Sequence, residues 1–171
     1  MEQVILVNKF DEPQGIMEKM EAHQKGLLHR AFSVFIFNSK NELLLQQRTR
    51  DKYHSASLWT NTCCSHPRLG ENNIDAAKRR LHEEMGMRCE LVNTFSFIYK
   101  APLENGLMEN EFDYVFFGFS DELPLINPNE VQAYRYVNLK VLQNDIKQQP
   151  QLYTSWLKIC LDRVIEYSKV L

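Results

Sequence analysis

The sequence predicts one domain of the α+β class. Strand-like and helix-like segments follow one another in no regular alternation, and no internal repeat, low-complexity segment or linker interrupts them. A length of 171 residues fits a single domain with a good-sized core. We therefore expect residues 1–171 to form one folded unit.

The composition is that of a globular protein without a membrane or nucleic-acid partner. Hydrophobic residues make up 44% of the chain and charged residues 25%, and the net charge is −2. The apolar runs are too short to span a membrane, and the N-terminal residues lack the pattern of a signal peptide. The four cysteines show no disulfide spacing. We expect a cytoplasmic protein with reduced thiols.

The first third of the chain predicts strands around one helix. Helical spacing of Ile16, Met17 and Met20, with Gly26 at the end, predicts a helix over Pro13–Gln24. Ser39-Lys40-Asn41 predicts the turn of a hairpin. The elements expected here are a strand at 3–7, the helix, a strand at 27–37, a strand at 42–48 and a polar loop at 49–57.

The stretch WTNTCCSHPRLGENNIDAAKRRLHEEMGM, residues 59–87, predicts a strand that leads into a helix. If residues 60–66 are extended, Cys64 and His66 point to one face of the strand, and Cys63 points to the other. Asn72 or Asn73 is a suitable helix N-cap, and Gly86 is a suitable C-cap. The glutamates at 83 and 84 then lie on the last turn of this helix.

The second half predicts a return to β-structure, followed by helices. The elements expected here are a strand at 88–100, a tight turn at Asn105-Gly106, a strand at 107–119, a strand at 130–138, a short helix at 139–148 and a final helix at 152–169. On the strand at 107–119, Glu109, Glu111 and Asp113 share one face by the period of two.

Three acids on one strand face have two interpretations. One is a solvated edge of the sheet, and the other is a metal site to which His23, His29 and His66 contribute imidazoles. Imidazole with carboxylate suits manganese, zinc or iron. The other two histidines, His54 and His82, have no comparable context, and we interpret them as loop and helix-surface residues.

The helix after Asn72 resembles the Nudix box, G-x5-E-x7-R-E-U-x-E-E-x-G-U. The positions in register are Glu71, Arg79, Leu81, Glu83, Glu84, Gly86 and Met87. Two positions depart from the pattern, because Ser65 replaces the first Gly and Arg80 replaces the Glu after Arg. The resemblance implies a Nudix-like fold, with a mixed β-sheet sandwiched between helices. Arg80 argues against ordinary Nudix hydrolysis, because that Glu belongs to the magnesium-binding carboxylates of the family.

A closer resemblance, to the type 1 isopentenyl diphosphate isomerase family, covers most of the chain. The motifs that carry it are His23, GLLHRAFSVF at 26–35, LLLQQR at 43–48, WTNTCCSHP at 59–67, the altered Nudix box, ENE at 109–111 and Trp156 in TSW. It implies an enzyme that interconverts isopentenyl diphosphate and dimethylallyl diphosphate through a carbocation-like intermediate. The implied partner is this small substrate alone, and the implied assembly is a monomer or a weak homodimer.

The same resemblance implies a role for individual positions. One divalent metal (Mn²⁺, Zn²⁺ or Mg²⁺) is held by His23, His29, His66, Glu109 and Glu111. A magnesium ion lies near Glu84 and is completed by the substrate diphosphate, which Arg48, Lys52 and Arg80 bind. Cys64 and Glu111 are the catalytic pair, Tyr99 is an assisting phenol, and Trp156 is the aromatic ring beside the reacting carbon.

The residues alone leave two alternative functions for this chain. A Nudix diphosphate hydrolase needs the Glu that is absent at position 80. A non-catalytic protein with a structural zinc ion would use Cys63, Cys64 and His66, but it lacks the paired ligand spacing of such sites.

Overall fold

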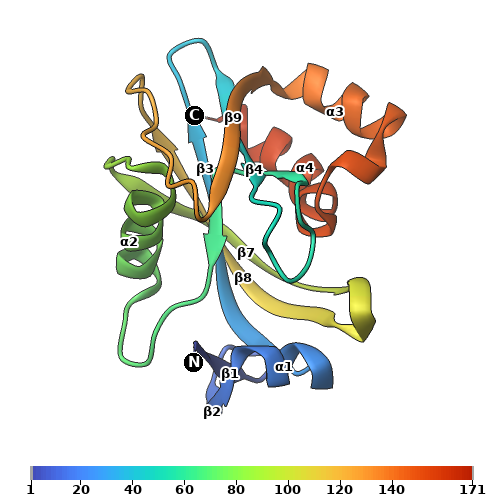
Figure 1. Cartoon of the computed structure of the whole chain (residues 1–171). Helices are drawn as coiled ribbons and strands as arrows, with labels where there is room; N and C mark the ends of the chain where they lie inside the picture. The colour runs from blue at the N-terminus through green and yellow to red at the C-terminus, as the bar shows by residue number, and fades with distance from the viewer. Residues whose placement is uncertain (1, 171) are drawn as a thin grey trace.

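The computed structural model describes residues 2–170, which fold around a mixed β-sheet (Figure 1). The strands are β1 (Gln3–Val7), β2 (Pro13–Glu18), β3 (His29–Phe37), β4 (Glu42–Arg48), β5 (Trp59–Thr60), β6 (Cys63–Ser65), β7 (Leu91–Pro102), β8 (Met108–Phe119) and β9 (Val131–Asn138). The helices are α1 (Lys19–Lys25), α2 (Asn73–Met85), α3 (Leu139–Gln148) and α4 (Ser155–Ser168). The predicted α+β class is confirmed.

Strand β3 is the centre of the sheet. It pairs in parallel with β8 along its whole length, and antiparallel with β1, β4 and β6. The pairs β7/β8 and β4/β9 extend the sheet on either side, and both are antiparallel. With partners along both edges and helices over both faces, every residue of β3 except Arg30 is buried.

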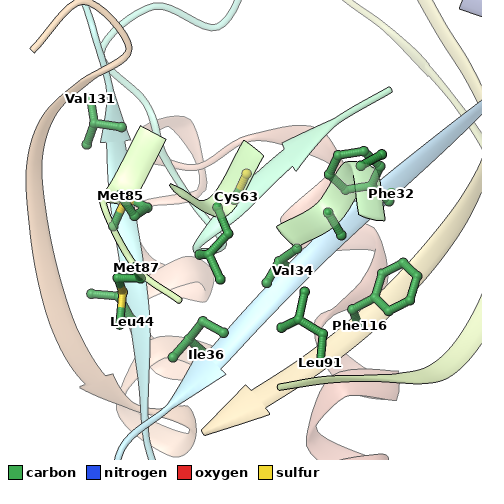
Figure 2. Close-up of a cluster of buried hydrophobic side chains, with 13 residues drawn as sticks. Phe32, Val34, Ile36, Leu44, Cys63, Met85, Met87, Leu91, Phe116 and Val131 are labelled. Atoms are coloured by element: carbon green, nitrogen blue, oxygen red, sulfur yellow. The ribbon is translucent and has the colours of Figure 1, made fainter. Parts of the chain in front are cut away.

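The two faces of β3 contact different helices. Phe32, Val34 and Ile36 pack with α2, whereas Phe35 and Phe37 pack with α3 and α4. Figure 1 shows α2 on one side of the sheet and α3 with α4 on the other. Figure 2 shows the first of these cores, with Cys63 among the apolar side chains under α2. The predicted arrangement of a sheet between helices is therefore confirmed.

The N-terminal helix is shorter than predicted. Residues Pro13–Glu18 form β2 and pair with β1 from Glu18 opposite Gln3 to Pro13 opposite Val7. The helical spacing at Ile16, Met17 and Met20 was therefore misleading, because pairing with β1 outweighs local propensity. Helix α1 begins only at Lys19, where the Glu18 side chain accepts a hydrogen bond from the Glu21 N–H. It ends at Gly26, as expected.

The predicted hairpin after β3 is confirmed only at its turn. Phe37 lies opposite Leu43, and the two strands then part. Beyond that point β3 pairs with β6 and β8, while β4 pairs with β5 and β9. This separation makes room for β6 beside β3 and for β5 beside β4.

Helix α2 has the boundaries that its capping residues predict. Asn72 is the N-cap, and Gly86 ends the helix at a φ of 65°. A Cβ at Gly86 would lie 2.5 Å from the carbonyl oxygen of Leu125, so the adjacent loop also requires glycine. This close approach fixes the last turn of α2 against the loop that leads to β9.

The remaining boundaries differ from the predicted ones by a few residues. Strand β7 begins at Leu91 instead of residue 88, and a 3₁₀ turn over Pro150–Leu152 precedes α4. Asn105 and Gly106 both have positive φ, at 59° and 73°, as a tight turn requires. Among the described helices, none is long and apolar enough to cross a membrane.

Candidate active site and metal centre

Three neighbouring strands bring His29, Glu111 and Tyr99 side by side. His29 is the register partner of Glu111 across β3/β8, and Tyr99 is its partner across β7/β8. The Tyr99 hydroxyl donates a hydrogen bond of 2.6 Å to Oε2 of Glu111. His29 Nε2 lies 3.5 Å from the other oxygen, Oε1. The centre of the site therefore follows directly from the strand register.

Two further histidines reach the same carboxylates from other elements. His66 follows β6, and its Nε2 lies 3.0 Å from Oε1 of Glu111. His23 projects from α1, and its Nε2 lies 3.3 Å from Oε2 of Glu109. All three imidazoles and both carboxylates are buried. The interpretation of the acidic face of β8 as a solvated edge is therefore wrong.

The donor atoms of this cluster suit a divalent metal. Nδ1 of His23 and Nδ1 of His29 each contact a backbone carbonyl, which only accepts hydrogen bonds, so the proton of each ring is on Nδ1. Their Nε2 atoms then present lone pairs inward, and neither has a hydrogen-bond partner. One ligand atom from each of His23, His29, His66 and Glu111 lies within 4.8 Å of the others. The pattern of backbone-anchored imidazoles is typical of metal ligands.

The two carboxylates of β8 have very different pKa values. Burial, together with the charge of Glu111, raises the pKa of Glu109 to about 7. Burial alone would also raise the pKa of Glu111, but His29 and His66 hold it well below its usual range. Burial alone would lower the pKa of His23, yet the Glu109 carboxylate raises it. Glu111 is therefore the carboxylate that stays ionised in this cluster.

The two adjacent cysteines lie on opposite faces of β6, as strand alternation predicts. Cys63 is fully buried in the core under α2. Cys64 lines the same pocket as His66 and Glu111, and packs beside Tyr99 and Trp156. Burial raises the pKa of the Cys64 thiol, which therefore keeps its proton at neutral pH. Cys64 is thus the cysteine that is placed for chemistry.

An aromatic side chain from the last helix closes the pocket over these groups. Trp156 is in the first turn of α4 and packs against Tyr99. The guanidinium carbon of Arg48 lies 5.3 Å from the centre of its ring. An apolar wall with a cation at its edge suits a ligand that has one apolar end and one anionic end.

The basic groups expected to bind diphosphate lie in the same pocket as the β8 carboxylates. Arg48, Lys52 and Arg80 all line it. Arg80 Nη2 is 2.5 Å from Glu84 Oε1, and Lys52 pairs with Glu130, which also lies 3.5 Å from Arg80. Glu84 in turn accepts a hydrogen bond of 2.7 Å from Gln46. Each cation therefore faces the pocket already oriented by an acidic neighbour or by the backbone.

Several residues of the pocket were not found from the sequence. The additional lining residues are Lys19, Gln46, Tyr53, His54 and Ser65, and Glu130 lies just behind them. His54 lies in a loop, as predicted, but it is only 6% exposed, and burial with the nearby Arg48 lowers its pKa to about 3. Its place in the pocket was not predicted, because the path of the 49–58 loop depends on positive φ at Ser55 and Ser57, which the sequence does not signal. His82 lies on the exposed surface of α2, as predicted.

Comparison with known proteins agrees with this geometry. The NUDIX domain model matches residues 27–157. A solved protein, DR0079 from Deinococcus radiodurans, has the same fold, with a TM-score of 0.79 and 21% identity over 95% of this chain and 98% of that one.

Curated relatives are much closer in sequence. Isopentenyl-diphosphate Delta-isomerase 2 from Aromatoleum aromaticum is 52% identical over 96% of this chain and 87% of the relative. Isopentenyl-diphosphate Delta-isomerase from Pectobacterium atrosepticum is 49% identical over 96% of this chain and 92% of the relative. The matches extend over almost the whole chain, and the chain therefore belongs to the isopentenyl-diphosphate Delta-isomerase family within the Nudix superfamily.

Proposed function

We propose that this protein interconverts isopentenyl diphosphate and dimethylallyl diphosphate by moving one carbon–carbon double bond. The observation that carries the proposal is the pair of proton-transfer groups in one pocket. Glu111 is held by Tyr99, while the Cys64 thiol packs against Tyr99 and Trp156. Moving the double bond requires a proton to be added at one carbon and removed at another, so two such groups are needed.

The groups fit an acid–base pair. An unactivated alkene is a weak base, so it takes a proton only from a well-placed acid in a site that excludes water. The neutral thiol of Cys64 is such an acid, and the ionised Glu111 is the base that removes the other proton. Tyr99 donates to Glu111 and fixes its orientation. The face of Trp156 stabilises the positive charge that develops on the substrate, by up to about 2 kcal/mol in a dry site.

We assign His23, His29, His66, Glu109 and Glu111 as the ligands of one divalent metal, with Mn²⁺, Zn²⁺ or Mg²⁺ as the candidate ion. The support is the set of inward-facing nitrogen lone pairs beside two buried carboxylates. A metal bound there supplies positive charge that orients Glu111 and favours its ionised form. Glu84 would hold a magnesium ion together with the diphosphate.

The diphosphate is a handle that fixes the alkene and does not itself react. Arg48, Lys52 and Arg80 supply the positive charge that binds it, and Arg48 lies next to Trp156. Arg80 also argues against the hydrolase alternative. It stands at a carboxylate position of the Nudix box and pairs with Glu84, so the helix lacks one magnesium ligand of that reaction.

Incubation with isopentenyl diphosphate in deuterated water tests the proposal. The proposed isomerase incorporates deuterium into the allylic product and releases no phosphate. A hydrolase releases phosphate or pyrophosphate, and a protein with only a structural metal does neither. Phosphate release without label would overturn the proposal.

We infer the cytoplasm as the location and a monomer or weak homodimer as the working form. All four cysteines are free, which suits a compartment that keeps thiols reduced. Cell fractionation and sedimentation of the purified protein test these two points.

A further inference from the structure

We propose that His54 is a positioning residue for Glu109, holding the outer oxygen of that carboxylate so that its other oxygen faces the metal site. The inference rests on the proposed metal site. His54 belongs to the loop at residues 49–58, in which the proposed function gives a role only to Lys52.

The two oxygens of Glu109 face different histidines. Oε2 lies 3.3 Å from Nε2 of His23, on the side of the metal cluster. Oε1 lies 3.7 Å from Nε2 of His54, whose ring stacks beside that of His23 with centroids 6.0 Å apart. Oε2 has no hydrogen-bond partner, as expected of a ligand atom, so Oε1 is the outer oxygen. A donor that faces the outer oxygen of a ligating carboxylate sets the orientation of that ligand.

The contacts of His54 favour one tautomer of its ring. Nδ1 lies 3.2 Å from the Ser55 hydroxyl, which can donate to it. Nε2 faces a carboxylate oxygen, which only accepts, so an attractive contact requires the proton on Nε2. In this tautomer the Nε2–H of His54 points toward Oε1 of Glu109, at 3.7 Å.

His54 and Glu109 lie together at one edge of the metal cluster. Ligand atoms from His23, His29, His66 and Glu111 lie within 4.8 Å of one another, and His54 is outside that set. His54 groups only with His23 and Glu109. Its ring also meets the Trp156 ring edge-on, with centroids 6.0 Å apart, so it fills the space between Glu109 and the apolar wall.

The same turn holds one of the diphosphate-binding residues. Arg48 donates from Nη2 to the carbonyl oxygen of His54, at 3.2 Å, and from Nε to that of Ser55, at 3.1 Å. Glu104 accepts a hydrogen bond from the Ser55 N–H and fixes the turn from the β7–β8 side. One short segment therefore positions both a metal ligand and a cation of the substrate site.

The test is the affinity of the metal-free protein for Mn²⁺, measured by competition with a chelator. The variants His54→Phe and His54→Met fill the space without an N–H donor, and His54→Gln keeps one. We expect the first two to bind Mn²⁺ about 10–100-fold more weakly than the natural protein, the range for loss of an outer partner of a ligand. His54→Gln should recover most of that loss. His82→Phe removes an exposed histidine and should leave the affinity unchanged.

The outcomes separate this inference from the metal site itself. If the natural protein binds no Mn²⁺, both fail. If His66→Asn loses the metal while His54→Phe and His54→Met bind normally, only the role of His54 is overturned. Equal losses in the Gln, Phe and Met variants would make His54 a direct ligand, which also overturns it. The unfolding temperature of each variant, measured in excess chelator, shows whether the metal-free variant is folded. If only one of His54→Phe and His54→Met folds, that variant alone is enough for the test.

Discussion

The carboxylates on the two sides of the pocket have different partners. On the β8 side, which we call the β8 wall, Glu109 and Glu111 face the imidazoles of His23, His29 and His66. On the α2 side, which we call the α2 wall, Glu84 lines the pocket and pairs with Arg80, and Arg80 also pairs with Glu83 outside the pocket.

The difference separates two tasks. Arginine is always charged and does not ligate metals, so the α2 wall is suited to an anion, and Glu84 would add only the magnesium ion that accompanies the diphosphate. Neutral imidazole offers a lone pair, so the carboxylates of β8 are suited to a metal. The Nudix helix is thus retained, while the proposed proton-transfer groups, Cys64 and Glu111, lie on strands β6 and β8.

The largest effect should follow from breaking the β8 wall. His66→Asn and Glu109→Gln should each lose bound metal and activity while the protein stays folded, because both residues lie outside the apolar cores. Elemental analysis and thermal unfolding measure the two properties, with His82→Asn as the control for an exposed histidine. Full metal content in both variants would remove His66 and Glu109 from the ligand set.

The next largest effect is expected from substitution of Cys64, compared with Cys63 on the other face of β6. Cys64→Ala should lower kcat by roughly 10²–10⁴-fold, the range for a positioned acid–base group. Cys64→Ser should be nearly as poor, because a hydroxyl is a much weaker acid than a thiol. Cys63→Ala should keep most activity and lose about 1 kcal/mol of stability through a small cavity. An inactive Cys63→Ala with an active Cys64→Ala would contradict the strand alternation.

A third substitution tests whether restoring the Nudix carboxylate on α2 gives diphosphate hydrolysis. Arg80→Glu restores the Nudix carboxylate but should not give efficient diphosphate cleavage, because the facing wall has an aromatic ring and a thiol where water would have to attack. Phosphate release from isopentenyl diphosphate is the measurement, with Arg80→Gln as the uncharged control. Robust diphosphatase activity in the Glu variant alone would show a pocket still built for hydrolysis.

A smaller effect tests what holds the α2 wall in place. Gly86→Ala should destabilise the protein by about 2–4 kcal/mol, because it adds a clash with the Leu125 carbonyl to the strain of positive φ. Gly70→Ala is the matched control, since φ there is 79° and a Cβ would meet nothing within 4 Å. Chemical denaturation gives both values. Equal losses would mean that contact with Leu125 does not fix the helix end.

The sequence predicted the parts of this site that depend on local periodicity. Alternation along β6 and β8 correctly separated Cys64 from Cys63 and aligned Glu109 with Glu111. The cap residues located α2.

Features that depend on distant partners were missed. The strand at Pro13–Glu18 exists because β1 lies beside it, and His54 is buried because a turn with positive φ carries it under Trp156. Glu130 joins Lys52 to Arg80 only after β9 has paired with β4. No periodicity within any of these segments encodes such contacts.

The division of labour between the walls is tested most directly by kcat and KM for Arg80→Ala and Cys64→Ala, measured side by side on isopentenyl diphosphate. Arg80→Ala should raise KM about 10–100-fold, as expected for loss of a charged hydrogen bond, with kcat close to that of the natural protein. Cys64→Ala should do the reverse, with a large loss of kcat and little change in KM. If Arg80→Ala loses as much kcat at saturating substrate as Cys64→Ala does, the α2 wall takes part in the chemistry and the separation is wrong.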